Sequence, residues 1–285
     1  MKIIRQIEVF APDYLGKMDV LIAGGKILAV EEQLEGGYEG VEVEELSGEG
    51  KVLTPGFIDC HFHILGGGGE GGYQNRTPEV TLSQLTTAGV TTVVGCLGTD
   101  GEGRDMTALI SKAKGLEAEG ISTYVYEGSY RLPVKTVTDS IIKDFLAIDK
   151  IIGIGEIAVS DHRSSQPSFE EFARAVADAR VGGMLSGKAG IINVHLGGGK
   201  RKLELLTRIV EETEIPITQF LPTHANRTPE LFEACVAFAK RGGTIDFTAS
   251  EDPDFWEKTD GEVRFSKALK RLIEEDVSLD NFTMT

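Results

Sequence analysis

The sequence predicts a (β/α)8 barrel, a TIM-like α/β fold, with a small appended β domain. From residue 54 onward, short apolar segments alternate with segments of helical periodicity, which is typical of parallel α/β proteins. Eight expected strands and seven expected helices fit a closed barrel better than an open sheet. Residues 1–53 instead contain short β patterns without helices between them. We therefore assign residues 1–53 to the β domain and residues 54–285 to the barrel.

The N-terminal segment carries the alternation and the turn signals of small antiparallel sheets. Residues 3–10 have a strand pattern, and residues 19–30 form a hairpin pattern around Gly24-Gly25, a two-residue turn signal. Valine and glutamate alternate over residues 41–44, which predicts one more strand.

The barrel segment can be divided into its expected elements. The strands are expected at residues 56–61, 91–97, 121–127, 151–156, 190–196, 218–224, 244–249 and 279–285. The helices are expected at residues 78–88, 106–119, 138–149, 169–181, 202–213, 229–241 and 264–275. Pro78 and Pro229 fit first helical turns, and Gly89 and Gly120 fit helix ends. Active sites of such barrels lie at the C-terminal ends of the strands.

Composition excludes several classes of protein. The chain has 285 residues and 41% apolar content, enough for one large core. A net charge of -16, from 45 acidic and 29 basic residues, argues against a nucleic-acid or anionic-membrane partner. No N-terminal signal pattern and no apolar run of membrane-spanning length occurs, so we expect a cytoplasmic protein. Cys60, Cys96 and Cys235 form no C-x-x-C pair and are interpreted as reduced core thiols.

Histidines and one carboxylate gather at the expected strand ends. His61 and His63 are two residues apart, so in a strand both side chains lie on one face and can share a metal ion. Glu156 ends the fourth expected strand, His195 the fifth and His224 the sixth. Any one of these residues alone is more often a structural side chain. Together, imidazoles and a carboxylate at one barrel mouth predict a centre for zinc or a similar divalent metal.

Several segments resemble a known enzyme family. Residues 56–63, GFIDCHFH, are similar to the opening metal motif of the amidohydrolase superfamily. Likeness to bacterial isoaspartyl dipeptidases is carried by residues 66–70 (GGGGE), 97–100 (LGTD), 160–164 (SDHRS) and 222–227 (PTHANR). The resemblance implies metal-dependent hydrolysis of β-aspartyl dipeptides, with a small dipeptide as the binding partner and a homo-oligomeric assembly.

The same resemblance implies a binuclear metal centre. Its two divalent ions, expected to be zinc, would be held by His61 and His63 on one side and by His195 and His224 on the other. A bridging carboxylate and a bridging hydroxide would join them, and such a pair of cations provides a nucleophile near neutral pH. Glu156 stands where family members carry a carboxylated lysine, and Lys150 and Lys188 lie off the strand end. We therefore expect Glu156 to be the bridge.

Substrate-binding roles also follow from the resemblance. It implies that Glu70 binds the substrate ammonium group and that Gly68 and Thr99 orient that end. It further implies that Arg163 and Arg227 bind the terminal carboxylate of the substrate. Tyr130 would be a catalytic residue that donates a hydrogen bond to the developing oxyanion. Taken without the resemblance, Arg163 could simply pair with Asp161, and the glycines could give loop flexibility only. His162, next to Arg163, is interpreted as structural.

One departure from the family pattern leaves alternative functions open. The family has a Ser-Asp-Gly segment after the eighth strand, whose aspartate binds metal and carries the proton, and this segment is absent before Thr285. We interpret the sequence as part of a longer chain. A cyclic amidase similar to a dihydroorotase or hydantoinase would share the metal ligands but would have no use for Glu70 and the two arginines. A non-catalytic metal-binding or ligand-binding protein is the third hypothesis.

Overall fold

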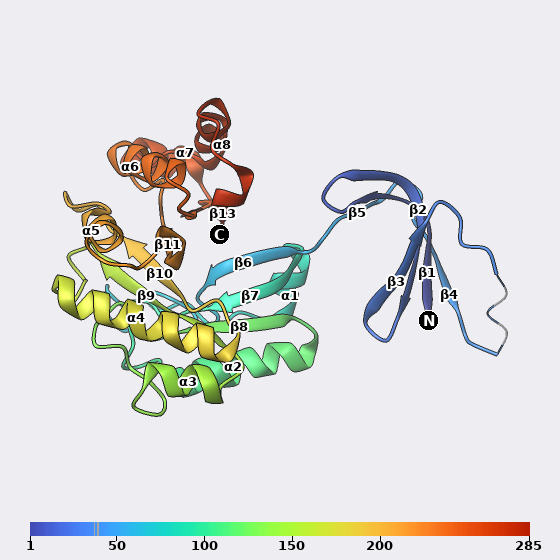
Figure 1. Cartoon of the computed structure of the whole chain (residues 1–285). Coiled ribbons are helices and arrows are strands. Elements are labelled where there is room, and N and C mark those ends of the chain that lie inside the picture. Colours follow the sequence, from blue (N-terminus) through green and yellow to red (C-terminus); the bar gives the residue numbers. More distant parts are fainter. Residues whose placement is uncertain (37, 39) are drawn as a thin grey trace. The chain divides into compact units, whose positions relative to one another are not determined.

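A computed structural model describes residues 1–36, 38 and 40–285 (Figure 1). The chain divides into two compact units, Met1–Phe57 and Ile58–Thr285. In the part of the chain that the structure describes, every helix is too short or too polar to cross a membrane.

The N-terminal unit is a five-stranded sheet. Its strands are β1 (Lys2–Phe10), β2 (Tyr14–Ala23), β3 (Lys26–Glu31), β4 (Glu44–Ser47) and β5 (Val52–Leu53). Strands β1 to β3 are antiparallel, whereas β4 and β5 run parallel to β1. The hairpin turns at Gly24 and Gly25, where φ is +59° and +72°. The strand predicted at 41–44 is wrong, because pairing with β1 begins only at Glu44, opposite Lys2.

The second unit contains eight strands in barrel order, which confirms the predicted fold class. They are β6 (Phe57–Phe62), β7 (Val90–Gly95), β8 (Ser122–Glu127), β9 (Ile151–Val159), β10 (Ile191–Leu196), β11 (Phe220–Thr223), β12 (Ile245–Phe247) and β13 (Phe282–Met284). Strands β6 to β11 form one sheet in sequential order, and β12 pairs in parallel with β13. The Ala225 amide donates to the Asp246 carbonyl at 3.0 Å, and the Thr285 hydroxyl donates to the His61 carbonyl at 2.8 Å. These bonds connect the two sheets on both sides.

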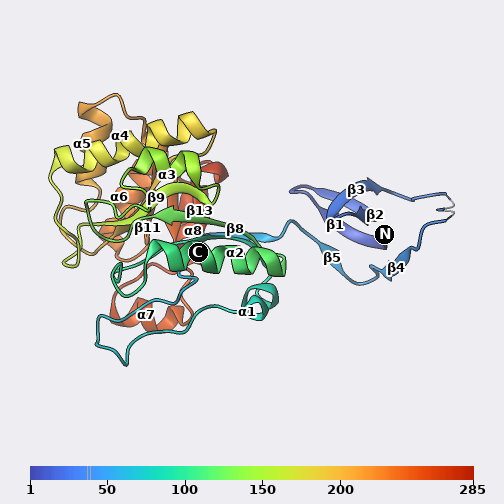
Figure 2. The same ribbon diagram turned by 90° about the horizontal axis from the view of Figure 1, so that it is seen from below.

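Several of the helices lie along the outer face of the six-stranded sheet, and Figure 2 shows this side from below. The helices are α1 (Leu82–Thr87), α2 (Met106–Glu119), α3 (Ile141–Ala147), α4 (Phe169–Ser186), α5 (Glu204–Glu212), α6 (Pro229–Lys240), α7 (Pro253–Thr259) and α8 (Phe265–Glu274), with 3-10 turns at Ile217–Gln219 and Leu279–Asn281. Fully buried side chains such as Phe145, Phe172 and Phe220 fill the space between sheet and helices. Each such burial contributes about 1.5–3 kcal/mol.

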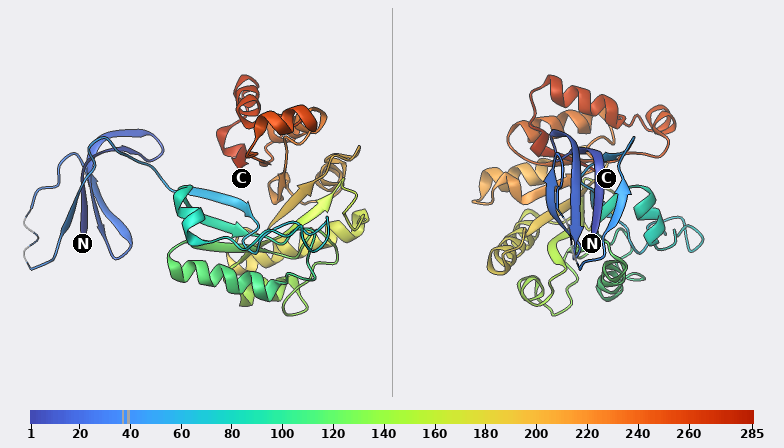
Figure 3. Two further views of the ribbon diagram at one scale, coloured as in Figure 1. Left: turned by 180° about the vertical axis from the view of Figure 1, so that it is seen from behind. Right: turned by 90° about the vertical axis from the view of Figure 1, so that its right-hand side faces the viewer.

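Most predicted helices are present, and two details differ. Helix α6 begins at Pro229 with Thr228 as its N-cap, as predicted, and Gly120 ends α2 with φ +112°. Helix α1 starts at Leu82 and not at Pro78, because Thr81 and Gln84 form a capping box there. Helix α7 was not predicted. Helices α6, α7 and α8 lie near β12 and β13, at the C-terminal end of the chain (Figure 3).

Candidate metal centre

Glu156 in β9 is the centre of the cluster of polar side chains at the barrel mouth. It is fully buried, and its Oε1 has no hydrogen-bond partner in the described chain. Its carboxylate oxygens lie near one nitrogen of each of four imidazoles: 3.0 Å from His195 Nδ1, 3.3 Å from His63 Nε2, 3.5 Å from His61 Nε2 and 4.0 Å from His224 Nε2. Burial alone would raise the pKa of Glu156, but His61 and His195 outweigh it and hold that pKa well below its usual range.

A glycine places Glu156 in this position. Gly155 has φ +143°, and a Cβ atom there would lie 2.5 Å from the carbonyl oxygen of Asn193. Only glycine allows β9 to approach β10 so closely just before Glu156. Strand β9 continues to Val159, so Glu156 lies within it and does not end it as predicted.

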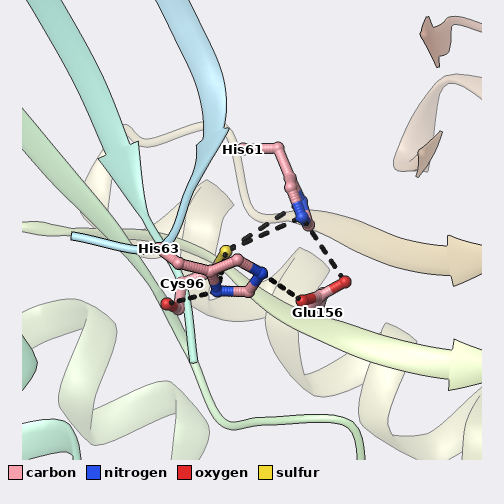
Figure 4. A group of neighbouring side chains, drawn as sticks. All are labelled: His61, His63, Cys96 and Glu156. Carbon is pink, nitrogen blue, oxygen red and sulfur yellow. Dashed lines mark hydrogen bonds and ion pairs between the residues drawn. The ribbon is translucent and has the colours of Figure 1, made fainter. Parts of the chain in front are cut away.

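The predicted metal ligands come together as two overlapping groups. His61, His63, Cys96 and Glu156 each offer one donor atom, and these atoms lie within 4.8 Å of one another (Figure 4). Glu156, His195 and His224 form the second group. Imidazole, carboxylate and thiol donors suit zinc and similar ions, and the unpartnered Glu156 oxygen is a free ligand atom. The residues therefore fit a divalent metal centre, and Glu156 belongs to both groups.

Two polar residues that sequence analysis missed orient the histidine rings. His61 Nδ1 lies 2.9 Å from Asn193 Oδ1, and His224 Nδ1 lies 2.7 Å from the Thr248 hydroxyl. Both contacts leave the Nε2 atoms facing Glu156, as is common for metal-ligating histidines. Asp59 accepts a hydrogen bond from the His61 backbone amide at 3.0 Å and does not contact the ring. Asn193 carried one signal in the sequence, since it lies two residues before His195 on the same strand face.

Neither lysine near the site replaces Glu156. Lys150 forms an ion pair with Glu117, and Lys188 donates to the carbonyl groups of Phe145 and Ile148 at 2.7 and 2.6 Å. Their ammonium groups are therefore bound outside the cluster.

Cys96 is a free, buried thiol, as predicted, and it is also part of this cluster, which sequence analysis did not predict. It follows β7, is buried, and its Sγ lies 3.6 Å from His63 Nδ1 and 3.9 Å from His61 Nε2. Burial raises the pKa of the Cys96 thiol, but the charges of His61 and His63 outweigh it and lower that pKa. Cys60 and Cys235 are free thiols, as predicted.

Tyr130 lies against the second ligand group. Its hydroxyl is 2.8 Å from His195 Nδ1, and the Arg163 guanidinium lies 5.2 Å from the centre of its ring. Burial, followed by the charge of Glu156, raises the pKa of Tyr130 far above neutrality. Tyr130 therefore keeps its proton and can act as a hydrogen-bond donor at this position.

Three of the predicted substrate-binding residues are in direct contact. Glu70 accepts hydrogen bonds from the Thr99 hydroxyl at 2.6 Å and from Arg163 Nη1 at 2.9 Å. Arg163 also pairs with Asp161, with Nε and Nη2 at 3.0 and 2.8 Å from its two oxygens. The Asp161 pairing considered from sequence is thus present together with the Glu70 contact. Gly68 lies on the same loop as Glu70, with φ +72°, and a Cβ atom there would lie 2.6 Å from the Asn75 carbonyl oxygen.

Arg227 lies beside His224 and differs from Arg163 in its contacts. Its Nε donates to the Leu196 carbonyl at 3.0 Å, and within the described ranges it has no carboxylate partner. A cavity of about 230 Å³ lies next to it and is also lined by His224 and by Trp256 of α7. Sequence analysis did not identify Trp256. His162 is exposed and lies outside the ligand groups.

Comparison with solved structures first defines the class of protein. Triazine hydrolase from Arthrobacter aurescens superposes with a TM-score of 0.60 at 19% identity, over 100% of this chain and 71% of that chain, so the two share a fold. No protein-family model matches the sequence. The chain therefore has the barrel fold of this hydrolase, with a candidate metal centre at its mouth.

Closer relatives define the family. Two crystal structures of β-aspartyl dipeptidase from Fervidobacterium islandicum AW-1, one of them in complex with β-Asp-Leu dipeptide, are each 51% identical to this chain. Their TM-scores are 0.92 and 0.93, and the matches cover 100% of this chain and 72% and 75% of those chains. The chain belongs to the β-aspartyl dipeptidase family of the amidohydrolase superfamily. Among curated proteins, imidazolonepropionase from Chromobacterium violaceum is 32% identical to this chain. That match covers 40% of this chain and only 28% of the relative's length.

Proposed function

We propose that the protein hydrolyses β-aspartyl dipeptides with a binuclear divalent metal centre. The main support is the position of Glu70, Arg163 and Arg227 beside the Glu156 cluster. One carboxylate and two guanidinium groups are complementary to the ammonium and carboxylate groups of a small zwitterion. The match to the Fervidobacterium enzyme supports the same substrate class.

The pairing of Glu70 with Arg163 explains how such a substrate would enter. In the structure, Glu70 Oε1 lies 2.9 Å from Arg163 Nη1, and Arg163 also pairs with Asp161. A dipeptide that carries both charges replaces this one ion pair with two, because its ammonium group faces Glu70 and its carboxylate faces Arg163. Arg227 would add a second cation for the same carboxylate. A substrate without an ammonium group would leave Glu70 without a cation once its carboxylate bound Arg163, which costs binding free energy.

His61 and His63 would hold one ion and His195 and His224 the other, with Glu156 between them. When bound, two divalent ions lower the pKa of a water molecule and polarise the scissile carbonyl. Tyr130 would donate its hydroxyl proton in a hydrogen bond to the carbonyl oxygen as negative charge develops. The buried position of Tyr130 keeps its hydroxyl protonated for this task.

A substrate comparison tests the proposal. The metal-loaded protein is assayed with β-aspartyl-leucine, α-aspartyl-leucine and dihydroorotate under identical conditions. We expect the highest kcat/KM for β-aspartyl-leucine. Preference for dihydroorotate would instead support a cyclic amidase, and a dihydroorotase from Lactobacillus johnsonii is 25% identical over 75% of this chain and 49% of its own length. Bound metal without turnover of any of the three would support a binding protein.

A further inference from the structure

We propose that Cys96 is a thiolate ligand of the ion held by His61 and His63. The proposal rests on the proposed metal centre and adds a sulfur donor to it. The ion would then be held by two imidazoles, one carboxylate oxygen of Glu156 and one sulfur.

The backbone places Cys96 beside both histidines. The Cys96 amide donates to the Phe62 carbonyl at 2.9 Å, so the end of β7 lies level with the residue between His61 and His63. From there the thiol points into the cluster, as Figure 4 shows. Gly98 keeps this space open, since a Cβ atom there would lie 3.0 Å from His63 Cε1 and 3.5 Å from Glu156 Oε1.

The spacing of the donor atoms is that of ligands around one ion. Zn–N and Zn–S bonds of about 2.0 and 2.3 Å at tetrahedral angles place the nitrogen and sulfur about 3.5 Å apart. His61 Nε2 lies 3.9 Å from Cys96 Sγ and 3.5 Å from Glu156 Oε2. Glu156 Oε1, fully buried and without a hydrogen-bond partner in the described chain, supplies an independent sign of a ligand at this position. It lies 3.3 Å from His63 Nε2.

A core thiol has different surroundings in this protein. Cys235 of α6 is equally buried but lies within the main hydrophobic core. Cys96 has two imidazoles within 4.0 Å. Because thiolate is a soft donor, its presence would favour zinc or cobalt over magnesium or manganese at this ion.

X-ray absorption at the zinc edge tests the assignment on the unmodified protein. With two zinc ions bound, we expect a sulfur scatterer at about 2.3 Å in addition to nitrogen and oxygen at about 2.0–2.2 Å. Cys96→Ser should remove the sulfur scatterer, whereas Cys235→Ser should retain it. A fully zinc-loaded protein whose spectrum requires no sulfur would overturn the proposal, whether or not the variant folds.

Cobalt provides a second readout. The Co²⁺-loaded protein should show a thiolate-to-cobalt charge-transfer band in the near ultraviolet that is lost in Cys96→Ser and kept in Cys235→Ser. An equal band in Cys96→Ser and the parent would contradict the assignment. Turnover of β-aspartyl-leucine without any sulfur signal would reject only the Cys96 ligand. A sulfur signal without turnover would reject only the dipeptidase activity.

Discussion

Two glutamates on neighbouring barrel strands are equally buried but differ in charge, since one is neutral and the other is an anion. Glu127 ends β8 and Glu156 lies in β9, and both are 0% exposed. Four imidazoles surround Glu156. In the described chain, the carboxyl oxygens of Glu127 accept no hydrogen bond, and the nearby charged group is the carboxylate of Asp144. Burial, and then Asp144, raises the pKa of Glu127 to about 10, whereas the pKa of Glu156 lies well below its usual range. The neighbours of a buried carboxyl group, and not its depth, decide whether it is an anion.

The strongest test of this contrast is Glu156→Gln, which keeps the shape of the side chain and removes its charge. We expect the loss of both ions and a decrease in kcat/KM on the order of 10³ or more, about 4 kcal/mol of transition-state stabilisation. Metal content by mass spectrometry and kinetics with β-aspartyl-leucine measure the two effects. Glu127→Gln is the matched control and should keep its metal. Full metal content in Glu156→Gln would disprove the bridging role.

A smaller effect is expected at Arg227, whose guanidinium we propose to bind the substrate carboxylate and whose contact with His224 is made through the backbone amide. Arg227→Ala should raise KM by roughly 10- to 100-fold, since a hydrogen bond to a charged group is worth about 1.5–3 kcal/mol. Metal content should remain that of the parent. Arg241→Ala, which removes an arginine paired with Glu211 on the surface, should change neither quantity. Metal loss in Arg227→Ala with an unchanged KM would place Arg227 in the metal site instead.

Sequence reasoning was sufficient for the parts of the fold that depend on local periodicity. The barrel order of strands and the start of α6 at Pro229 follow from apolar spacing and from capping residues. The strand at 41–44 failed because alternation alone does not supply a partner, and β1 pairs with the residues that follow. Helix α7 carries few apolar residues and buries none, so no amphipathic pattern marked it.

The candidate site shows the same limit. His61 and His63 could be paired from their spacing, because alternation in a strand is a local property. Cys96 could not be assigned in this way, since it follows the apolar residues of β7 and resembles a core position. Only the neighbouring strand, through the bond from the Cys96 amide to the Phe62 carbonyl, brings its thiol to the two imidazoles. Thr248 likewise reaches His224 from a different strand end.

The smallest expected effect concerns Glu127, the buried glutamate that stays protonated. Its pKa rises from an ordinary 4.5 to about 10 on folding, so between these values the unfolded chain loses a proton that the folded chain keeps. The free energy of unfolding should therefore fall as pH rises through this window, by at most about 1.4 kcal/mol per pH unit. Asp144, whose pKa is lowered from 3.8 despite its burial, loses its contribution only as pH falls below this window.

Glu127→Gln cannot ionise, so its free energy of unfolding should lack this slope. Urea unfolding of the parent and the variant from pH 5 to pH 9 measures the difference, which should favour the variant increasingly as pH rises. Asp144→Asn, which removes the neighbouring charge, should lower the pKa of Glu127 in the folded chain. The pH range over which the free energy of unfolding falls should then become narrower. It should also lower stability at every pH above 5, because the Asp144 carboxylate accepts hydrogen bonds from the Val137 and Thr138 amides. Parallel pH profiles for the parent and Glu127→Gln would mean that Glu127 is ionised when buried, and the contrast with Glu156 would then disappear.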